Sequence, residues 1–198
     1  MTCLETIKIK NKQFQNIHFH NERFNRTQQL FLKSNTLIDL SRIIEIPDDL
    51  TDEIYKCRVV YSNKIKKVEF QKYVILPIQS LQVVEHNEIN YSYKYTNREL
   101  LSELFQQRKM SDDILIVKNG LITDSYYCNV AFRQGEKWWT PRSPLLKGTQ
   151  RAHLIQQNII EEKEIKLTDL QTFSAVKLFN AMIDWEEAPC IFIQNVCV

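Results

Sequence analysis

The sequence contains little glycine: three residues in 198, at positions 120, 135 and 148. It has five cysteines but no Cys-x-x-Cys pair, and it has no apolar run of about 18 residues, the shortest that reads as a membrane-spanning helix. No low-complexity segment or internal repeat is present. The absence of a long apolar run argues against a transmembrane helix, and the five cysteines are most simply buried thiols or bystanders in a reducing compartment.

The charge is nearly balanced, with 26 Lys and Arg against 24 Asp and Glu and a formal net charge of +2. Electrostatics therefore give no reason to expect nucleic-acid binding beyond a short basic run at residues 64–67. The N-terminal residues lack the basic-then-apolar pattern of a signal peptide. We expect a cytoplasmic protein that binds neither nucleic acid nor membrane, with a hydrophobic core that the 43% hydrophobic content supports.

The three glycines mark special backbone positions in the second half of the chain. Asn119-Gly120, between two apolar runs, predicts a β-hairpin, and Gly135 predicts a second one. Gly148 precedes apolar positions at helical spacing. A helix that begins after a small residue presents backbone N–H groups to an anion.

Other patterns predict the remaining elements. In order, they indicate a strand over 2–9, a helix over 21–32, a short helix over 48–57, strands over 56–61 and 66–70, an extended segment over 73–84, a short helix over 165–173, and strands over 175–180 and 189–193. The helix over 21–32 should bury Phe24, Leu30 and Phe31.

Lys94 stands just before a predicted helix, because Thr96 and Glu99 have the spacing of a capping box. The positive end of that helix, with the flanking Tyr93 and Tyr95, would lower the pKa of the lysine amine. A lowered pKa suits a lysine that forms a Schiff base. The pattern alone leaves open an ordinary surface lysine.

Five ordered segments resemble motifs of the class IV aminotransferase family of fold-type IV pyridoxal-phosphate enzymes, and most closely its 4-amino-4-deoxychorismate lyases. They are Lys94-x-x-Asn97-Arg98, Gly120-x-x-Thr123-Asp124-x-x-x-x-Asn129, Trp139-Thr140-Pro141, Leu146-x-Gly148-x-x-Arg151 and Phe179-Asn180-Ala181-Met182. Upstream, Leu4-Glu5-Thr6 and His20-x-x-Arg23 are similar to the family's Phe-Glu-Thr strand and His-x-x-Arg helix start. The first half is shorter than in typical members.

The resemblance implies an α+β fold of two domains. A small, shortened N-terminal α+β domain would span residues 1–72, and a larger β-rich domain that binds pyridoxal phosphate would span residues 73–198. It also implies a homodimer and a small-molecule amino substrate.

The same resemblance implies roles for single residues. Lys94 would be the catalytic lysine that holds the cofactor and moves protons. The cofactor phosphate would bind Arg23 and the backbone at Thr149 and Gln150. No metal is implied.

The resemblance also implies residues that contact the cofactor ring and residues that contact the substrate. Asp124, where the family usually has glutamate, would pair with the pyridine nitrogen. Asn129 would fix the backbone beneath the ring. Asn180, Ala181 and Met182 would form a wall of the substrate site.

Three functions are compatible with these motifs. The first is an aminodeoxychorismate lyase, which eliminates pyruvate to give 4-aminobenzoate for folate synthesis; Lys-x-x-Asn-Arg and Asn-Ala-Met favour it. The second is a transaminase acting on a small amino acid, of the branched-chain or D-amino acid type. The third is a shortened, non-catalytic member of the family, against which the retained lysine, acid and phosphate segment argue.

Overall fold

The computed structural model describes residues 2–32 and 36–198. Contacts between residues divide the chain into two compact units: Met1–Ile75 with Tyr93–Asn97, and Leu76–Ser92 with Arg98–Val198. Within the described residues, none of the helices has the length and apolar character needed to cross a bilayer.

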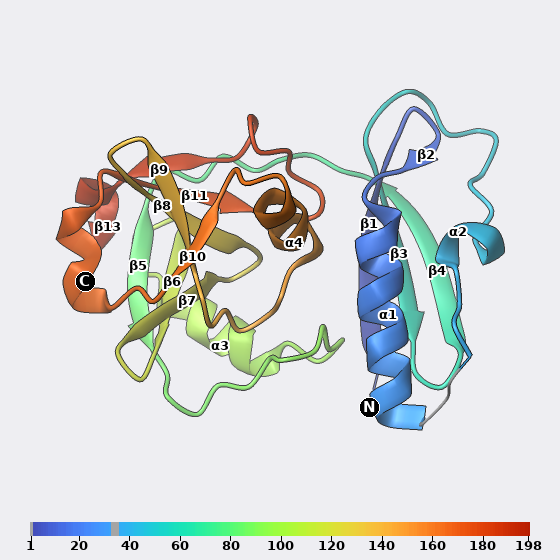
Figure 1. Ribbon diagram of the computed structural model, residues 1–198, viewed down its shortest axis with the longest axis horizontal. Helices are drawn as coiled ribbons and strands as arrows, with labels where there is room; N and C mark the ends of the chain where they lie inside the picture. The colour runs from blue at the N-terminus through green and yellow to red at the C-terminus, as the bar shows by residue number, and fades with distance from the viewer. Residues whose placement is uncertain (1, 33–35) are drawn as a thin grey trace. The chain divides into compact units, whose positions relative to one another are not determined.

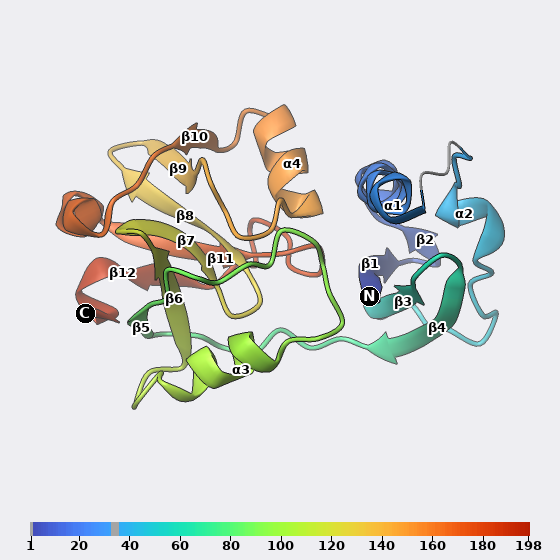
Figure 2. The ribbon, with the colours of Figure 1, turned by 90° about the horizontal axis from the view of Figure 1, so that it is seen from below.

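The first unit is a sheet with a long helix on one face (Figures 1 and 2). Its elements are β1 Cys3–Lys10, β2 Gln13–Phe14, α1 Ile17–Leu32, α2 Leu40–Ile43, β3 Tyr55–Tyr61 and β4 Ile65–Lys72. Among the described residues the sheet has four strands in the order β2-β1-β3-β4, and every pair is antiparallel. The predicted first strand and the predicted hairpin of β3 and β4 are confirmed.

The helix α1 presents a partly polar stripe to the sheet. It begins at Ile17, four residues before the predicted start. Its buried positions have helical spacing and are His20, Arg23, Phe24, Thr27 and Gln28. The expected burial of Leu30 is wrong, because this residue lies off that stripe and is 56% exposed. The side chain of Phe31 falls outside the described residues.

The predicted short helix over residues 48–57 is also wrong. That segment forms turns that lead into β3, whereas α2 lies earlier and is capped by the side chain of Asp39. The hydroxyl of Thr51 makes local hydrogen bonds, with the Glu53 carboxylate at 2.9 Å and the Tyr55 hydroxyl at 3.0 Å. Local bonds of this kind compete with helix formation.

Residues 93–97 pair with the outer edge of β1. The amide of Leu4 donates to the carbonyl of Lys94 at 2.9 Å, and the amide of Thr96 donates to the carbonyl of Thr2 at 3.0 Å. The hydroxyl of Thr96 donates to the same carbonyl at 3.2 Å, so the predicted capping box is wrong. The domain limits 1–72 and 73–198 stay a prediction, but residues 93–97 belong by their contacts to the first unit.

The second unit, whose residues are all described, is built on a mixed sheet. Its elements are β5 Leu81–Glu85, α3 Glu99–Gln106, β6 Asp113–Lys118, β7 Leu121–Ser125, β8 Asn129–Gln134, β9 Lys137–Pro141, α4 Thr149–Gln156, β10 Glu161–Lys163, η1 Leu167–Thr172, β11 Ala175–Phe179, β12 Cys190–Phe192, η2 Ile193–Asn195 and β13 Val196–Cys197. The nine strands run in the order β10-β9-β8-β7-β6-β5-β13, with β11 pairing both β8 and β12.

Both predicted hairpins of this unit are confirmed. Asn119 and Gly120 have φ of 51° and 74°, as the turn between β6 and β7 requires. Gly135, with φ of 61°, turns β8 into β9. The strands β6 and β8 are buried on both faces over most of their length, so the core of this unit lies around the middle of the sheet.

Candidate functional site

A carboxylate stands on the apolar face of β1. Strand alternation places Glu5 on the same face as Cys3, Ile7 and Ile9, which belong to the hydrophobic core of the first unit. Glu5 is fully buried there. A charge in such a place is costly unless it is paired and hydrogen-bonded.

The partners of Glu5 are two residues one turn apart on α1. Arg23 donates from Nε to Oε1 at 2.9 Å and from Nη2 to Oε2 at 2.6 Å, and Nδ1 of His20 lies 2.7 Å from Oε2. Burial alone would raise the pKa of Glu5, but the charge of Arg23 and these hydrogen bonds outweigh it and lower the pKa to about 2. Arg23 is therefore held in one orientation. Its predicted role as a phosphate ligand stays a prediction.

His20 is a positioning group in this arrangement. Burial lowers the pKa of His20, and the charges of Arg23 and Lys94 lower it further. The hydrogen bond to Glu5 and the charge of Glu5 act in the opposite direction without cancelling the decrease. A neutral imidazole beside an ionised carboxylate donates from Nδ1, so Glu5 fixes its tautomer.

Lys94 lies at the centre of a three-residue turn. The amide of Tyr95 donates to the carbonyl of Tyr93 at 2.8 Å across Lys94, and the rings of the two tyrosines meet edge to face with centroids 5.8 Å apart. Both tyrosines pack against the core of the first unit. The lysine side chain is half-buried, and its carbonyl is fixed by Leu4. The backbone at Lys94 is thus pinned on both sides, while its Schiff-base role stays a prediction.

Asp124 is the buried acid of the second unit. It lies on β7, opposite Asn129 of β8, and is 6% exposed. Nδ2 of Asn129 donates to Oδ1 of Asp124 at 2.7 Å and to the carbonyl of Leu146 at 2.8 Å. The amide of Leu146 donates to Oδ2 of Asp124 at 2.9 Å. One carboxylate and one amide thus connect β7, β8 and the segment that leads into α4.

Burial raises the pKa of Asp124 to about 6. The amide of Leu146, the side chain of Asn129 and the charge of Arg151 oppose the rise but do not cancel it. The group is ionised at neutral pH and becomes protonated in mildly acidic solution. A carboxylate with this pKa is suited to accept a hydrogen bond from a protonated ring nitrogen.

The helix α4 begins directly after this cluster. Gly148 is its N-cap and has no side chain with which to cap the first turn. Thr149 and Gln150, in the first turn, are buried. Backbone N–H groups in the first turn of a helix have no carbonyl partner within the helix and favour an anion. The geometry suits the predicted phosphate contacts at Thr149 and Gln150, which stay a prediction.

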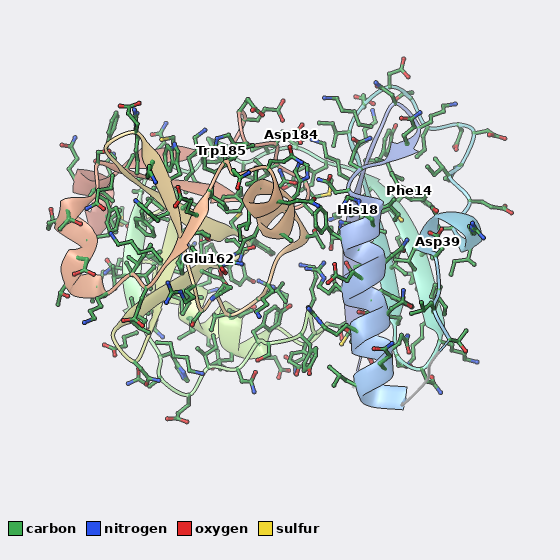
Figure 3. The ribbon with its side chains drawn as sticks, viewed as in Figure 1. Phe14, His18, Asp39, Glu162, Asp184 and Trp185 are labelled. Atoms are coloured by element: carbon green, nitrogen blue, oxygen red, sulfur yellow. The ribbon has the colours of Figure 1, made fainter. Side chains whose placement is uncertain are left out.

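Arg151 anchors the same helix to the sheet. Its Nη2 donates to the carbonyl of Pro141 at 2.9 Å and to Oε1 of Glu162 at 2.6 Å; Figure 3 labels Glu162 on β10. The arginine is 5% exposed, and its Nε is a buried atom without a protein partner within the described residues. Arg151 therefore has two effects: its charge lowers the pKa of Asp124, and its hydrogen bonds hold α4 against β9 and β10.

The predicted substrate wall forms a tight turn after β11. The amide of Met182 donates to Oδ1 of Asn180 at 2.8 Å, and Nδ2 of Asn180 lies 3.3 Å from the thiol of Cys128. The N–H of Met182 is thus engaged within the turn. The substrate role of Asn180, Ala181 and Met182 stays a prediction.

Arg98 of the first motif lies in a separate aromatic cluster. Its Nη1 donates to the hydroxyl of Tyr91 at 3.2 Å and its Nη2 to the carbonyl of Tyr126 at 2.6 Å. The guanidinium also stacks over the rings of Tyr126 and Tyr127, 4.7 Å from each centroid. These contacts join the start of α3 to the turn after β7.

Sequence reasoning assigned no role to Glu5 or to the backbone of Leu146. Glu5 lies within the Leu4-Glu5-Thr6 motif. The signal for its role is that it alternates with Cys3, Ile7 and Ile9 on the apolar face of the strand. Leu146 acts through its amide, which no side-chain pattern discloses. Within residues 2–32 and 36–198, no group of three or more His, Cys, Asp or Glu residues is arranged to hold a metal ion.

Comparison with known proteins places the chain in a family. The amino-transferase class IV family model matches residues 59–187. An uncharacterized protein of Haemophilus influenzae is 38% identical over 180 residues, which are 90% of this chain and 96% of the relative. The crystal structure of a provisionally assigned 4-amino-4-deoxychorismate lyase from Haemophilus somnus 129PT is 32% identical, with a TM-score of 0.84 over 91% of this chain and 96% of that chain.

A more distant structure shares the fold. A hypothetical aminotransferase from Mycobacterium tuberculosis, in its PLP-bound form, is 13% identical, with a TM-score of 0.75 over 96% of this chain and 80% of that chain.

The family model spans more than half of the chain, and the fold agrees with that of the family's structures. The protein belongs to the class IV aminotransferase family. It is an enzyme of the α+β, fold-type IV architecture that the sequence motifs predicted.

Proposed function

We propose that the protein is a pyridoxal-phosphate-dependent lyase that eliminates pyruvate from aminodeoxychorismate and releases 4-aminobenzoate. The observation that supports it is the direct connection of the ionisable, buried Asp124 to the segment that leads into α4. Asn129 donates to Asp124 and to the carbonyl of Leu146, and the amide of Leu146 donates to Asp124. An acid and an anion-binding helix terminus held together fit a cofactor that carries a ring nitrogen and a phosphate. The similarity to the provisionally assigned Haemophilus somnus lyase favours the reaction.

The bound cofactor would act as an electron sink that stabilises negative charge at the carbon beside the substrate amine. Asp124, ionised at neutral pH, would hold a proton on the ring nitrogen. The first turn of α4, at Thr149 and Gln150, would orient the phosphate, together with Arg23. The amine of Lys94 would hold the cofactor and then move the proton that substrate cleavage requires.

The reaction is tested with purified protein and aminodeoxychorismate. We expect 4-aminobenzoate and pyruvate in equal amounts without an added keto acid, and we expect Lys94→Ala to abolish both. Lys137→Ala is the matched control, since Lys137 is an exposed lysine paired with Glu161 and should keep the activity. The proposal fails if the protein with bound cofactor forms no 4-aminobenzoate.

A transaminase of the same family would give a different result. It would transfer the amino group of a small amino acid only when a keto acid is added. A non-catalytic member would show neither reaction. The cofactor is tested separately by absorbance at about 410–420 nm, which is typical of pyridoxal phosphate bound covalently to a lysine. Loss of this band in Lys94→Ala would support Lys94 as the attachment point.

The homodimer implied by the family is a further part of this proposal. Light scattering coupled to gel filtration would give twice the chain mass of 23.6 kDa.

A further inference from the structure

The backbone conformation of Gly148 does not require glycine. Its φ of −70° and ψ of 149° are extended values that any L-residue adopts. At the N-cap of a helix, Ser, Thr, Asn and Asp also stabilise at least as well as glycine. The reason for glycine at this position must therefore lie in its surroundings.

The surroundings of Gly148 are occupied by the side chain of Asn129. A Cβ built on Gly148 would overlap Oδ1 of Asn129 and lie 3.2 Å from its Cγ. A flexible side chain would swing away at little cost. The Asn129 amide is buried, however, and Nδ2 is fixed by the carboxylate of Asp124 and the carbonyl of Leu146. Moving Oδ1 away from a new Cβ would require breaking one or both of these hydrogen bonds.

We infer that Asn129 is a positioning residue that locks the carboxylate of Asp124 and the backbone before α4 into one rigid unit, and that Gly148 is glycine in order to admit its amide. The amide of Leu146 closes the unit from the other side by donating to Asp124. The separation between the acid and the start of α4 is then fixed before any ligand binds. Fixing it in advance lowers the ordering cost of binding a rigid ligand at both ends.

The catalytic meaning of this unit rests on the proposed function, in which Asp124 meets the ring nitrogen and the first turn of α4 meets the phosphate. The inference that Asn129 fixes Asp124 and the backbone before α4 does not depend on the proposed function. Its tests use the whole 198-residue chain without added cofactor or substrate, so a negative lyase assay and a negative result here are distinguishable.

The first test is a double-mutant cycle between Asn129→Ala and Gly148→Ala, read as thermal unfolding midpoints. Gly148→Ala should lower the midpoint by about 4 °C or more in the parent, because overpacking a closed site is destabilising. In the Asn129→Ala background the same substitution should cost almost nothing, since the atom that the new Cβ meets is gone. If Gly148→Ala does not fold alone but folds in the double variant, the inference is equally supported. Equal costs in both backgrounds would overturn it.

The second test separates positioning from a loss of stability. The pKa of Asp124 is measured from the pH dependence of its carboxyl carbon NMR signal. The Asn129 amide donates to the ionised form, so Asn129→Ala should raise the pKa of Asp124 above its value in the parent. Gly148→Ala should also raise it, although Gly148 makes no bond to Asp124 in the parent. An unchanged Asp124 pKa in Gly148→Ala would contradict the inference.

Gly135→Ala is the matched control. A Cβ at Gly135 would meet nothing within 4 Å, whereas its positive φ of 61° makes the substitution strained. Gly135→Ala should therefore destabilise the protein equally with and without Asn129, and should leave the pKa of Asp124 unchanged. A shift of the Asp124 pKa in this control as large as in Gly148→Ala would mean that general loosening explains both, and would overturn the inference.

Discussion

Glu5 and Asp124 are both buried carboxylates, and their neighbours move their pKa values in opposite directions. Glu5 is paired with the guanidinium of Arg23, a full charge at hydrogen-bond distance. Asp124 has the neutral donors of Asn129 and Leu146 as its hydrogen-bonding partners. Glu5 is therefore ionised throughout the usual working range of pH, and Asp124 changes its protonation near pH 6.

Replacing Glu5 with glutamine should be strongly destabilising. The change leaves the charge of Arg23 buried without its counter-charge, and breaking a buried pair in this way costs about 3 to 5 kcal/mol. Urea unfolding of the parent and of Glu5→Gln measures the difference.

Glu69→Gln is the control for that comparison. Glu69 pairs with Arg58 at 3.0 Å, but both side chains are partly exposed. Its loss should cost less than about 1 kcal/mol. A similar loss of unfolding free energy in the two variants would show that the burial of the Glu5 pair does not increase its contribution to stability.

Residues of the candidate site could be proposed from the sequence where their side chains belong to a motif with a characteristic spacing. Asp124 and Asn129 were found in this way, and the structure shows them in contact. The strand pattern of β1 places Glu5 on the apolar face with Cys3, Ile7 and Ile9, but its partners were not predictable, because they lie on α1 and local spacing does not show which helix residues meet that face. The exposure of Leu30 was missed because the stripe that α1 buries is partly polar.

Among the elements, the hairpin of β6 and β7 depends on its turn residues. Gly120 has a φ of 74° in open space, so a substitution there is resisted by backbone strain and not by crowding. We expect Gly120→Ala to lower the free energy of unfolding by about 1 kcal/mol, and Gly120→Val by more. Chemical denaturation of the variants measures both values.

Asn119→Gly is the partner variant in this turn. The side chain of Asn87 accepts from the backbone amide of Asn119, which glycine retains, and glycine adopts the φ of 51° without strain. Its free energy of unfolding should stay within about 1 kcal/mol of the parent. A larger loss in Asn119→Gly than in Gly120→Ala would refute the argument from backbone conformation.

The pairing of residues 93–97 with β1 should be visible in amide hydrogen exchange. Thr96→Val removes the hydroxyl bond to the carbonyl of Thr2 and keeps the backbone bond to it. Losing about 1 kcal/mol locally should speed exchange of the amides of Leu4 and Thr96 by about fivefold.

Thr172→Val removes a similar hydroxyl bond, to the carbonyl of Asp169 in the second unit. It should leave the exchange of Leu4 and Thr96 unchanged. Slower or unaltered exchange in Thr96→Val would show that the hydroxyl bond does not hold the segment.

Sequence reasoning predicted elements well where turn residues are diagnostic, as at Asn119-Gly120 and Gly135. It failed at Thr96, whose spacing to Glu99 imitates a capping box. In the structure that hydroxyl donates to the carbonyl of Thr2, just before β1 and 94 residues earlier, and the N-cap of α3 is Arg98. The spacing of neighbouring residues does not reveal a hydrogen-bond partner that lies far away in the sequence.

At the scale of the whole molecule, Asp124 links stability to pH. Its pKa is raised from 3.8 in the unfolded chain to about 6 in the folded protein, so folding favours the protonated form. This contribution to stability is complete below about pH 3.8, declines as the pH rises, and is lost above about pH 6. A rise of the pKa from 3.8 to about 6 makes this contribution on the order of 3 kcal/mol.

Comparison with Asp124→Asn isolates this effect, because asparagine does not titrate. The free energy of unfolding of the parent minus that of the variant should fall by about 3 kcal/mol between pH 3.5 and 7.5. Denaturant titrations across this range test it. The contribution of Glu5 to stability depends on pH in the opposite direction. Because folding lowers the pKa of Glu5, the protein loses this contribution only as the pH falls below about 4.5. A difference that rises with pH would show that the pKa of Asp124 is lowered by folding.

The division of residues 1–75 and 93–97 from the rest has a consequence for any attempt to cut or recombine the gene. A fragment that stops at residue 75 keeps Glu5, His20 and Arg23 but loses the amine of Lys94. A fragment that starts at residue 76 keeps the amine but lacks the strand whose Leu4 amide holds its turn. Neither half inherits the lysine together with its support, so crossovers between relatives should be placed after residue 97, where β1 and Lys94 stay on one parental segment.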